Sequence, residues 1–195
     1  MKTKIGVLAV LILSGHFYVR AQVQVQVSKE PLHKKVLENK YFRLMDVWLK
    51  TGDTSMYHIH STPSVFLYFT NSVYGAQPLG GAWTQVEAVA GHTWYNSFSP
   101  DTVVHRVCNA EDAPIHVMDI ELTAPFKPTA RRGPLPFTIL YENERVVAYR
   151  LARSSLNDER ISGRGPMIMA MVKGSEIRIS NAKGKKTIVL KEGDH

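Results

Sequence analysis

Two stretches decide the fold of this chain: GDTSMYHIH, residues 52–60, and GHTWYNSFSPDTVVHRVCN, residues 91–109. The first carries His58 and His60 at positions i and i+2. On a β-strand successive side chains point to opposite faces, so these two imidazoles lie on one face, a few ångströms apart. With His105 on a neighbouring strand, they predict a site of three neutral nitrogens that can chelate one metal ion.

The spacing around the histidines is itself informative. Gly52 lies six positions before His58, which gives G-x5-H-x-H, and Pro100, His105 and Asn109 give P-x4-H-x3-N. This resembles the two motifs of the cupin superfamily, G-x5-H-x-H-x3-4-E-x6-G and G-x5-7-P-x-G-x2-H-x3-N.

The resemblance covers roughly residues 36–123. It implies an all-β, RmlC-like fold: a conical jelly-roll barrel, or double-stranded β-helix, with His58, His60 and His105 pointing inward as metal ligands. Three nitrogens with open coordination positions suit zinc or non-haem iron, and imidazole also binds Mn, Ni or Cu, so the metal identity stays open.

The chain departs from the motifs where a metal-binding Glu is expected. Four and five residues after His60 stand Ser64 and Val65, and neither is a carboxylate. Three neutral imidazoles would leave a divalent ion its full +2 charge, so the site should attract an anionic or chelating ligand. Asp119 and Glu121, which share one face of a later predicted strand, are alternative carboxylates.

Many short apolar segments separated by Gly and Pro predict a β-sandwich or barrel, and no long helical periodicity is present. Residues 71–83, which hold Gly75 and Pro78, are expected to be a loop. The expected strands are residues 23–27, 42–49, 64–70, 84–90, 103–108, 115–122, 145–152, 167–172, 176–180 and 187–190.

The domain organisation suggests two β units of unequal completeness. Residues 124–136 contain four Pro and form an expected linker between the barrel and residues 137–195. A faint repeat at an offset of 104 residues favours a bicupin, in which residues 137–195 are a partial second cupin-like unit without metal ligands. Its unfinished barrel would leave an open sheet edge, which a longer chain or a homodimer would cover.

The N-terminus is typical of a secretory signal peptide. Lys2 and Lys4 precede an apolar run that is too short to span a bilayer, and cleavage before Gln22 would leave 174 residues with a net charge of +4. Residues 22–35 are then an N-terminal extended segment of a secreted or periplasmic protein with no membrane contact. This modest charge gives no support for nucleic-acid binding, and a single cysteine rules out a disulfide framework.

The walls of the expected cavity follow from the period-2 rule. The substrate pocket is expected to include alternate residues of the strands next to the histidines and a later histidine: Met56, Phe66, Tyr68, Trp94 and His116. Cys108 lies three residues after His105, hence on the opposite strand face, and is not expected to be a ligand.

The leading hypothesis is an exported metal-binding cupin that acts as a dioxygenase-like enzyme on a small chelating or anionic substrate. The superfamily that it resembles also includes isomerases, lyases and proteins without catalysis, and fold alone does not choose among them. The alternatives are therefore a non-catalytic cupin that binds a sugar or an organic acid, and a structural scaffold.

Overall fold

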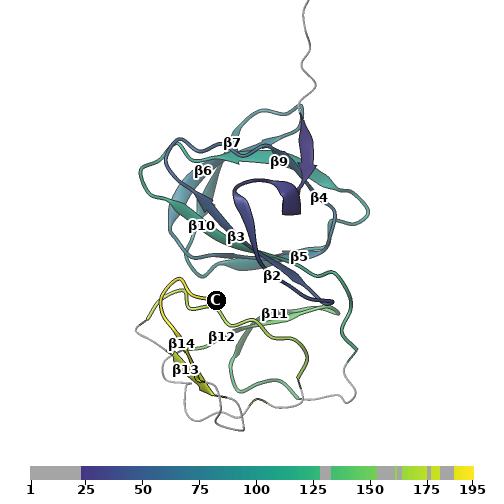
Figure 1. The fold of residues 1–195 in the computed structure, drawn as a ribbon, viewed down its shortest axis with the longest axis vertical. Helices are drawn as coiled ribbons and strands as arrows, with labels where there is room; N and C mark the ends of the chain where they lie inside the picture. Colours follow the sequence, from purple (N-terminus) through teal and green to yellow (C-terminus); the bar gives the residue numbers. More distant parts are fainter. Residues whose placement is uncertain (1–22, 128–132, 153–160, 162–163, 175–176, 181–186) are drawn as a thin grey trace, which may run out of the picture.

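The computed structural model describes residues 23–127, 133–152, 161, 164–174, 177–180 and 187–195. The expected signal peptide, residues 1–21, lies outside them. The described residues form a β-barrel with a smaller unit of two hairpins against one side (Figure 1). None of their helices is long and apolar enough to cross a membrane.

The barrel elements are β1 (Gln24–Gln26), the 3-10 helix η1 (Val27–Lys29), β2 (His33–Glu38), β3 (Arg43–Leu49), β4 (Tyr57–His60), β5 (Ser64–Tyr68), β6 (Ser72–Pro78), β7 (Thr84–Ala88), β8 (Thr93–Asn96), β9 (Val103–Cys108) and β10 (Ile115–Glu121).

Two five-stranded sheets make up the barrel, in the orders β1-β4-β9-β6-β7 and β2-β3-β10-β5-β8. Apart from the pairs β2–β3 and β6–β7, strands that are neighbours in a sheet are not consecutive in the sequence, as in a jelly roll. This confirms the all-β jelly-roll barrel that the motifs predicted. The barrel also starts earlier than residue 36, because β1 pairs in parallel with β4 and β2 pairs with β3.

Alternation along the strands separates an inner from an outer face. On β3, Met45, Val47 and Leu49 point inward and pack with Val27 and Ile115. The intervening side chains point outward, away from the barrel interior. β3 and β10 therefore each contribute to two different cores.

A second hydrophobic cluster, the outer core, lies between the barrel and the described residues from 133 onward, which are called the C-terminal half below. Its buried members come from β3, β5 and β10 and the residues next to them: Phe42, Leu44, Val65, Phe69, Met118 and Ile120. Against them pack Tyr141, Val146, Ile168, Ala170 and Val172. The C-terminal half thus covers the outer face of the second sheet, as Figure 1 shows below β2 and β5.

The C-terminal half forms two separate two-stranded sheets, β11 (Thr138–Glu142) with β12 (Val147–Arg150), and β13 (Ile177–Ser180) with β14 (Thr187–Leu190). No second barrel is present in the described residues, and the bicupin stays a prediction. Residues 167–172 were expected to be a strand but lie in none; they use alternate side chains to pack on the barrel instead. In the expected linker, Phe126 packs edge-on against Tyr41 with ring centroids 5.5 Å apart.

The prediction of a loop at residues 71–83 was wrong, because β6 occupies most of it. Gly75 is no turn residue there: a Cβ at this position would lie 2.7 Å from the Cys108 Sγ on β9. Glycine in a strand often marks such a close approach of a neighbour. Pro78, the second apparent breaker, stands at the strand's last position.

Candidate metal centre

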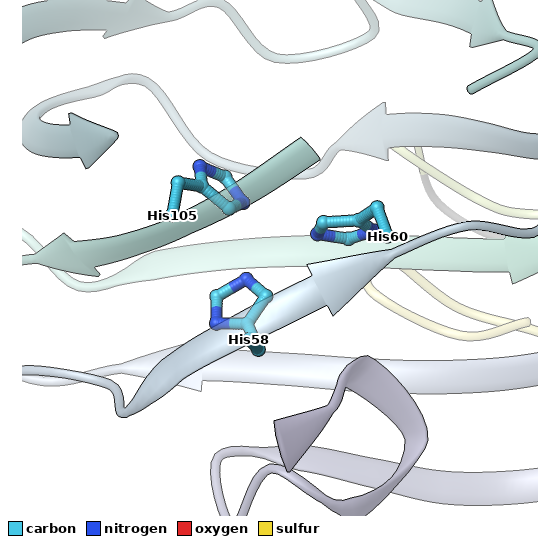
Figure 2. Close-up of side chains that lie close together, drawn as sticks. All are labelled: His58, His60 and His105. Carbon is cyan, nitrogen blue, oxygen red and sulfur yellow. The ribbon is translucent and has the colours of Figure 1, made fainter. Parts of the chain in front are cut away.

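The three predicted ligands come from two adjacent strands. β4 places His58 and His60 on its inner face, and β9 pairs antiparallel with it so that His105 lies directly opposite His58. Figure 2 shows the three rings turned toward a common centre. One nitrogen from each ring lies within 4.8 Å of the other two, an arrangement that can hold a metal ion.

The motif glycine and asparagine hold the two strands in this relation. Gly52 has a φ of +84°, a conformation that favours glycine, in the turn before β4. The Gly52 amide donates to the Asn109 carbonyl at 2.7 Å, and the Asn109 amide donates to the Asp53 carbonyl at 2.9 Å. The buried Asn109 side chain also donates to the Leu49 carbonyl at 3.0 Å. The motif residues outside the histidines therefore join the two histidine strands.

Burial keeps all three imidazoles neutral at ordinary pH. Desolvation lowers the pKa of His58 to about 3, of His60 to about 2 and of His105 to about 4, and repulsion from neighbouring histidines, among them His33, adds to the effect. Neutral imidazole is the form that binds metal, so the site need not lose protons before it takes up an ion.

This shift predicts a pH-dependent stability of the metal-free protein. Between about pH 6.5 and the lowered pKa values, the unfolded chain binds protons at these three histidines that the folded protein excludes. The free energy of unfolding should therefore fall as the pH drops below about 6.5. We expect the dependence, measured by urea unfolding between pH 7 and pH 4, to be shallower in His60→Ala; an unchanged slope would contradict it.

One side of the centre carries a carboxylate that the motifs do not specify. Asp119 on β10 is fully buried, and its Oδ2 lies 3.9 Å from the His60 Nδ1. Neither of its oxygens has a hydrogen-bond partner among the described residues, and the same holds for the His60 Nδ1. Burial, with the nearby Glu121 charge, raises the pKa of Asp119 well above its usual range. Asp119 thus places a carboxyl group beside His60, but it lies outside the group of three histidines whose nitrogens converge.

The centre opens into a cavity of about 200 Å³ inside the barrel. Phe66, Tyr68 and Trp94 line it, and Phe66 and Trp94 stack with ring centroids 4.9 Å apart. The Tyr68 and Tyr74 hydroxyls form a 2.6 Å hydrogen bond. Among its described lining residues there is no Lys or Arg.

Two residues expected in the pocket lie elsewhere. Met56 precedes β4, where the strand alternation does not apply, and its side chain is 37% exposed. His116 occupies the outer face of β10, stacked between Trp48 and Phe69 at 3.9 Å and 4.3 Å, with its Nε2 2.5 Å from the Asp46 Oδ1. It belongs to the contact region under the C-terminal half. Cys108 also faces away from the cavity, as expected.

Among the cavity residues that sequence reasoning missed, two pack directly on the histidine rings. His33 lies in a polar segment with no motif around it, and only the folding of β2 onto β3 brings it beside His58, with ring centroids 4.6 Å apart. Phe98 stacks on His60 at 5.0 Å and has a φ of +49°, which is uncommon for a residue other than glycine. No sequence pattern predicts that conformation.

Comparison with known proteins finds no matching family model and no curated relative. Solved structures do resemble the chain. A cupin domain protein from Bordetella pertussis Tohama I is 20% identical, with 47% of this chain and 92% of that chain covered and a TM-score of 0.42. An uncharacterised protein with a double-stranded β-helix domain from Klebsiella pneumoniae is 16% identical, with 49% and 79% covered and a TM-score of 0.39. An RmlC-like cupin family protein from Methanocaldococcus jannaschii is 9% identical, with 54% and 85% covered and a TM-score of 0.38.

Proposed function

We propose that this chain is a cupin that binds one divalent metal ion through His58, His60 and His105 and uses it for dioxygenase-like chemistry on a small chelating substrate. The observation that supports this most directly is the convergence of three neutral imidazoles at the wall of an aromatic cavity. We also infer export, from the apolar N-terminal stretch of the sequence.

The donor set fits such an ion. The His58 Nδ1 donates to the Met56 carbonyl at 3.0 Å, which leaves its Nε2 for the metal. The His60 Nδ1 faces Asp119, so its Nε2 is the free donor. The buried His105 Nε2 has no partner among the described residues. A histidine whose other nitrogen donates to a carbonyl, as that of His58 does, is the usual form of a protein metal ligand.

The surrounding residues restrict what can bind. A bound metal would supply a positive charge and open coordination positions for an oxygen-bearing ligand. The cavity walls offer aromatic surface and the paired Tyr68 and Tyr74 hydroxyls, both kept neutral because burial raises their pKa. Since its described walls hold no Lys or Arg, an anionic group of the substrate has to be neutralised at the centre itself. This favours a small planar molecule with two oxygens, such as a diketone or a catechol, over a sugar.

Metal content tests the proposal. Purified protein, stripped with a chelator and reconstituted in turn with Fe, Mn, Ni, Cu and Zn, should retain one ion per chain by elemental analysis. The double variant His58→Ala/His60→Ala should retain none, because it removes two of three ligands. His116→Gln is the matched control, since it removes a buried imidazole from the outer face of the barrel.

Wild-type protein that retains no metal would refute the proposal and leave a metal-free binding or scaffold role. If metal is retained, oxygen uptake with diketones, catechols and thiols should be seen for at least one compound. Tight binding without oxygen uptake would favour the non-catalytic binding protein.

A further inference from the structure

Two tyrosine hydroxyls meet inside the cavity, at residues that neither histidine motif contains. Tyr68 on β5 and Tyr74 on β6 both line the cavity, and their hydroxyl oxygens lie 2.6 Å apart. Tyr68 is 4% exposed and Tyr74 is half-buried. The Tyr68 amide donates to the His92 carbonyl at 3.1 Å, and Tyr74 is paired with Val86 across β6 and β7. Backbone pairing therefore holds both tyrosines in place before any ligand binds.

The hydroxyl pair lies to one side of the histidine centre, in the same cavity. The residues of β9 that line the cavity are Val103, His105 and Val107. Val107 therefore stands about 7 Å along the strand from His105. Tyr74 packs on the same buried cluster as Val107. A molecule that is held at the histidines and extends past His105 toward Val107 would approach the two hydroxyls.

The pair has one hydrogen-bond donor in reserve. Each tyrosine hydroxyl carries one hydrogen and can also accept a hydrogen bond. One of the two hydrogens lies between the oxygens, and neither oxygen has another hydrogen-bond partner among the described residues. Burial raises the pKa of both tyrosines, so both hydroxyls keep their hydrogen at neutral pH. The second hydrogen is therefore available to an acceptor that enters the cavity.

The surroundings of the pair favour an uncharged acceptor. The described walls of the cavity hold no Lys or Arg, and the Trp94 ring packs against Tyr68 with centroids 4.9 Å apart. Burial of a charged group without an opposite charge costs far more free energy than one hydroxyl can offset. A carbonyl oxygen accepts the same hydrogen bond without that cost.

We propose that the Tyr68–Tyr74 pair donates its second hydroxyl hydrogen bond to a carbonyl oxygen of the molecule that binds at the three-histidine centre. The inference rests on the proposed metal-binding function and names the ligand more closely. The substrate is then a small planar chelator with a third oxygen, an uncharged acceptor remote from the two oxygens that the metal binds.

Binding of two matched catechols to the Zn²⁺-loaded protein tests this without any catalytic assay. Zinc has no redox chemistry, so it leaves both probes intact. Protocatechualdehyde carries a carbonyl group remote from its chelating oxygens, and 4-methylcatechol carries a methyl group at the same position. Calorimetric titration gives the two dissociation constants, and the compared quantity is the constant of 4-methylcatechol divided by that of the aldehyde. The different acidities of the probes affect every variant alike, so they cancel when variants are compared.

In the double variant Tyr68→Phe/Tyr74→Phe this ratio should fall about 3- to 10-fold, as expected for the loss of one hydrogen bond between uncharged groups. Zn²⁺ and 4-methylcatechol should bind as in the wild-type protein. The double variant removes both partners of the buried hydrogen bond and keeps both rings, so its stability should change little. Tyr95→Phe is the matched control, because Tyr95 packs on the outer core and does not line the cavity.

Two results would overturn the proposal while leaving the metal site intact. An unchanged ratio in the double variant would show that the hydroxyls do not reach the carbonyl. Equal weakening of both catechols would show that the pair shapes the cavity without contacting that oxygen. If the double variant does not unfold cooperatively, Tyr68→Phe and Tyr74→Phe are measured separately, and the proposal fails if neither lowers the ratio. Failure of the wild-type protein to bind Zn²⁺ or 4-methylcatechol is the separate result that removes the proposed function, and this inference with it.

Discussion

Replacement of Asp119 by valine should stabilise the metal-free protein and weaken its metal binding at the same time. Asp119 is 1% exposed, and neither carboxyl oxygen has a partner among the described residues. A buried polar group without a hydrogen bond costs about 1–3 kcal/mol, and valine fits a strand interior without that cost. The Asp119 Oδ2 also lies 3.9 Å from the His60 Nδ1, however, so this carboxyl group would support the His60 ring when a metal is bound. Loss of such a partner typically weakens metal binding about 10- to 100-fold.

The pH dependence identifies the source of the stabilisation. The pKa of Asp119 is raised in the folded protein, so above its unfolded value of about 3.9 the folded state holds a proton that the unfolded chain releases. The stability gained in Asp119→Val should therefore be largest at neutral pH and shrink as the pH falls toward 4. Urea unfolding and metal titration on one preparation measure both effects. Asp119→Asn, which keeps the shape and an acceptor, should retain more metal affinity, and a destabilised Asp119→Val would contradict the interpretation.

Replacement of Phe69 by alanine should lower the free energy of unfolding strongly and leave the metal affinity unchanged, in contrast to the replacement of Asp119. Phe69 is 7% exposed on the outer face of the second sheet, where it stacks on His116 at 4.3 Å. It belongs to the buried cluster that contacts the C-terminal half. Truncation of a buried Phe costs about 3–5 kcal/mol.

The metal affinity should be unaffected because Phe69 does not line the cavity. Chemical denaturation and a metal titration below the unfolding transition distinguish the two properties. Val36→Ala, at a side chain that is 51% exposed, is the matched control for stability. A large loss of metal affinity in Phe69→Ala would show that the outer core and the cavity are coupled, and that the two faces of the sheet cannot be treated separately.

The ligand trio could be predicted because it depends on local geometry and a recognisable spacing. His58 and His60 share a face on any strand, and the motif around Pro100 and Asn109 places His105 on the strand beside them. The all-β class followed from short apolar segments and frequent breakers. These features need no knowledge of which distant strands pair.

The rest of the site depends on distant pairing and was therefore missed or misplaced. His33 reaches the cavity only through the pairing of β2 with β3. Gly75 was interpreted as a breaker because its neighbour Cys108 is 33 residues away in the chain. Met56 was placed by extending the strand alternation one residue beyond the strand's first residue, Tyr57.

The three-residue strand β1 covers what would otherwise be an exposed edge of the barrel sheet. It is the parallel partner of β4, with Val25 opposite His58, and so β4 is an interior strand of its sheet. Without β1, the backbone amides and carbonyls along one side of β4 would be open to a strand from another molecule. A variant that begins at residue 28 would make β4, which carries two of the histidines, an edge strand with unpaired backbone groups. Preparations that keep residues 24–26 should accordingly be the ones that stay monodisperse at high concentration.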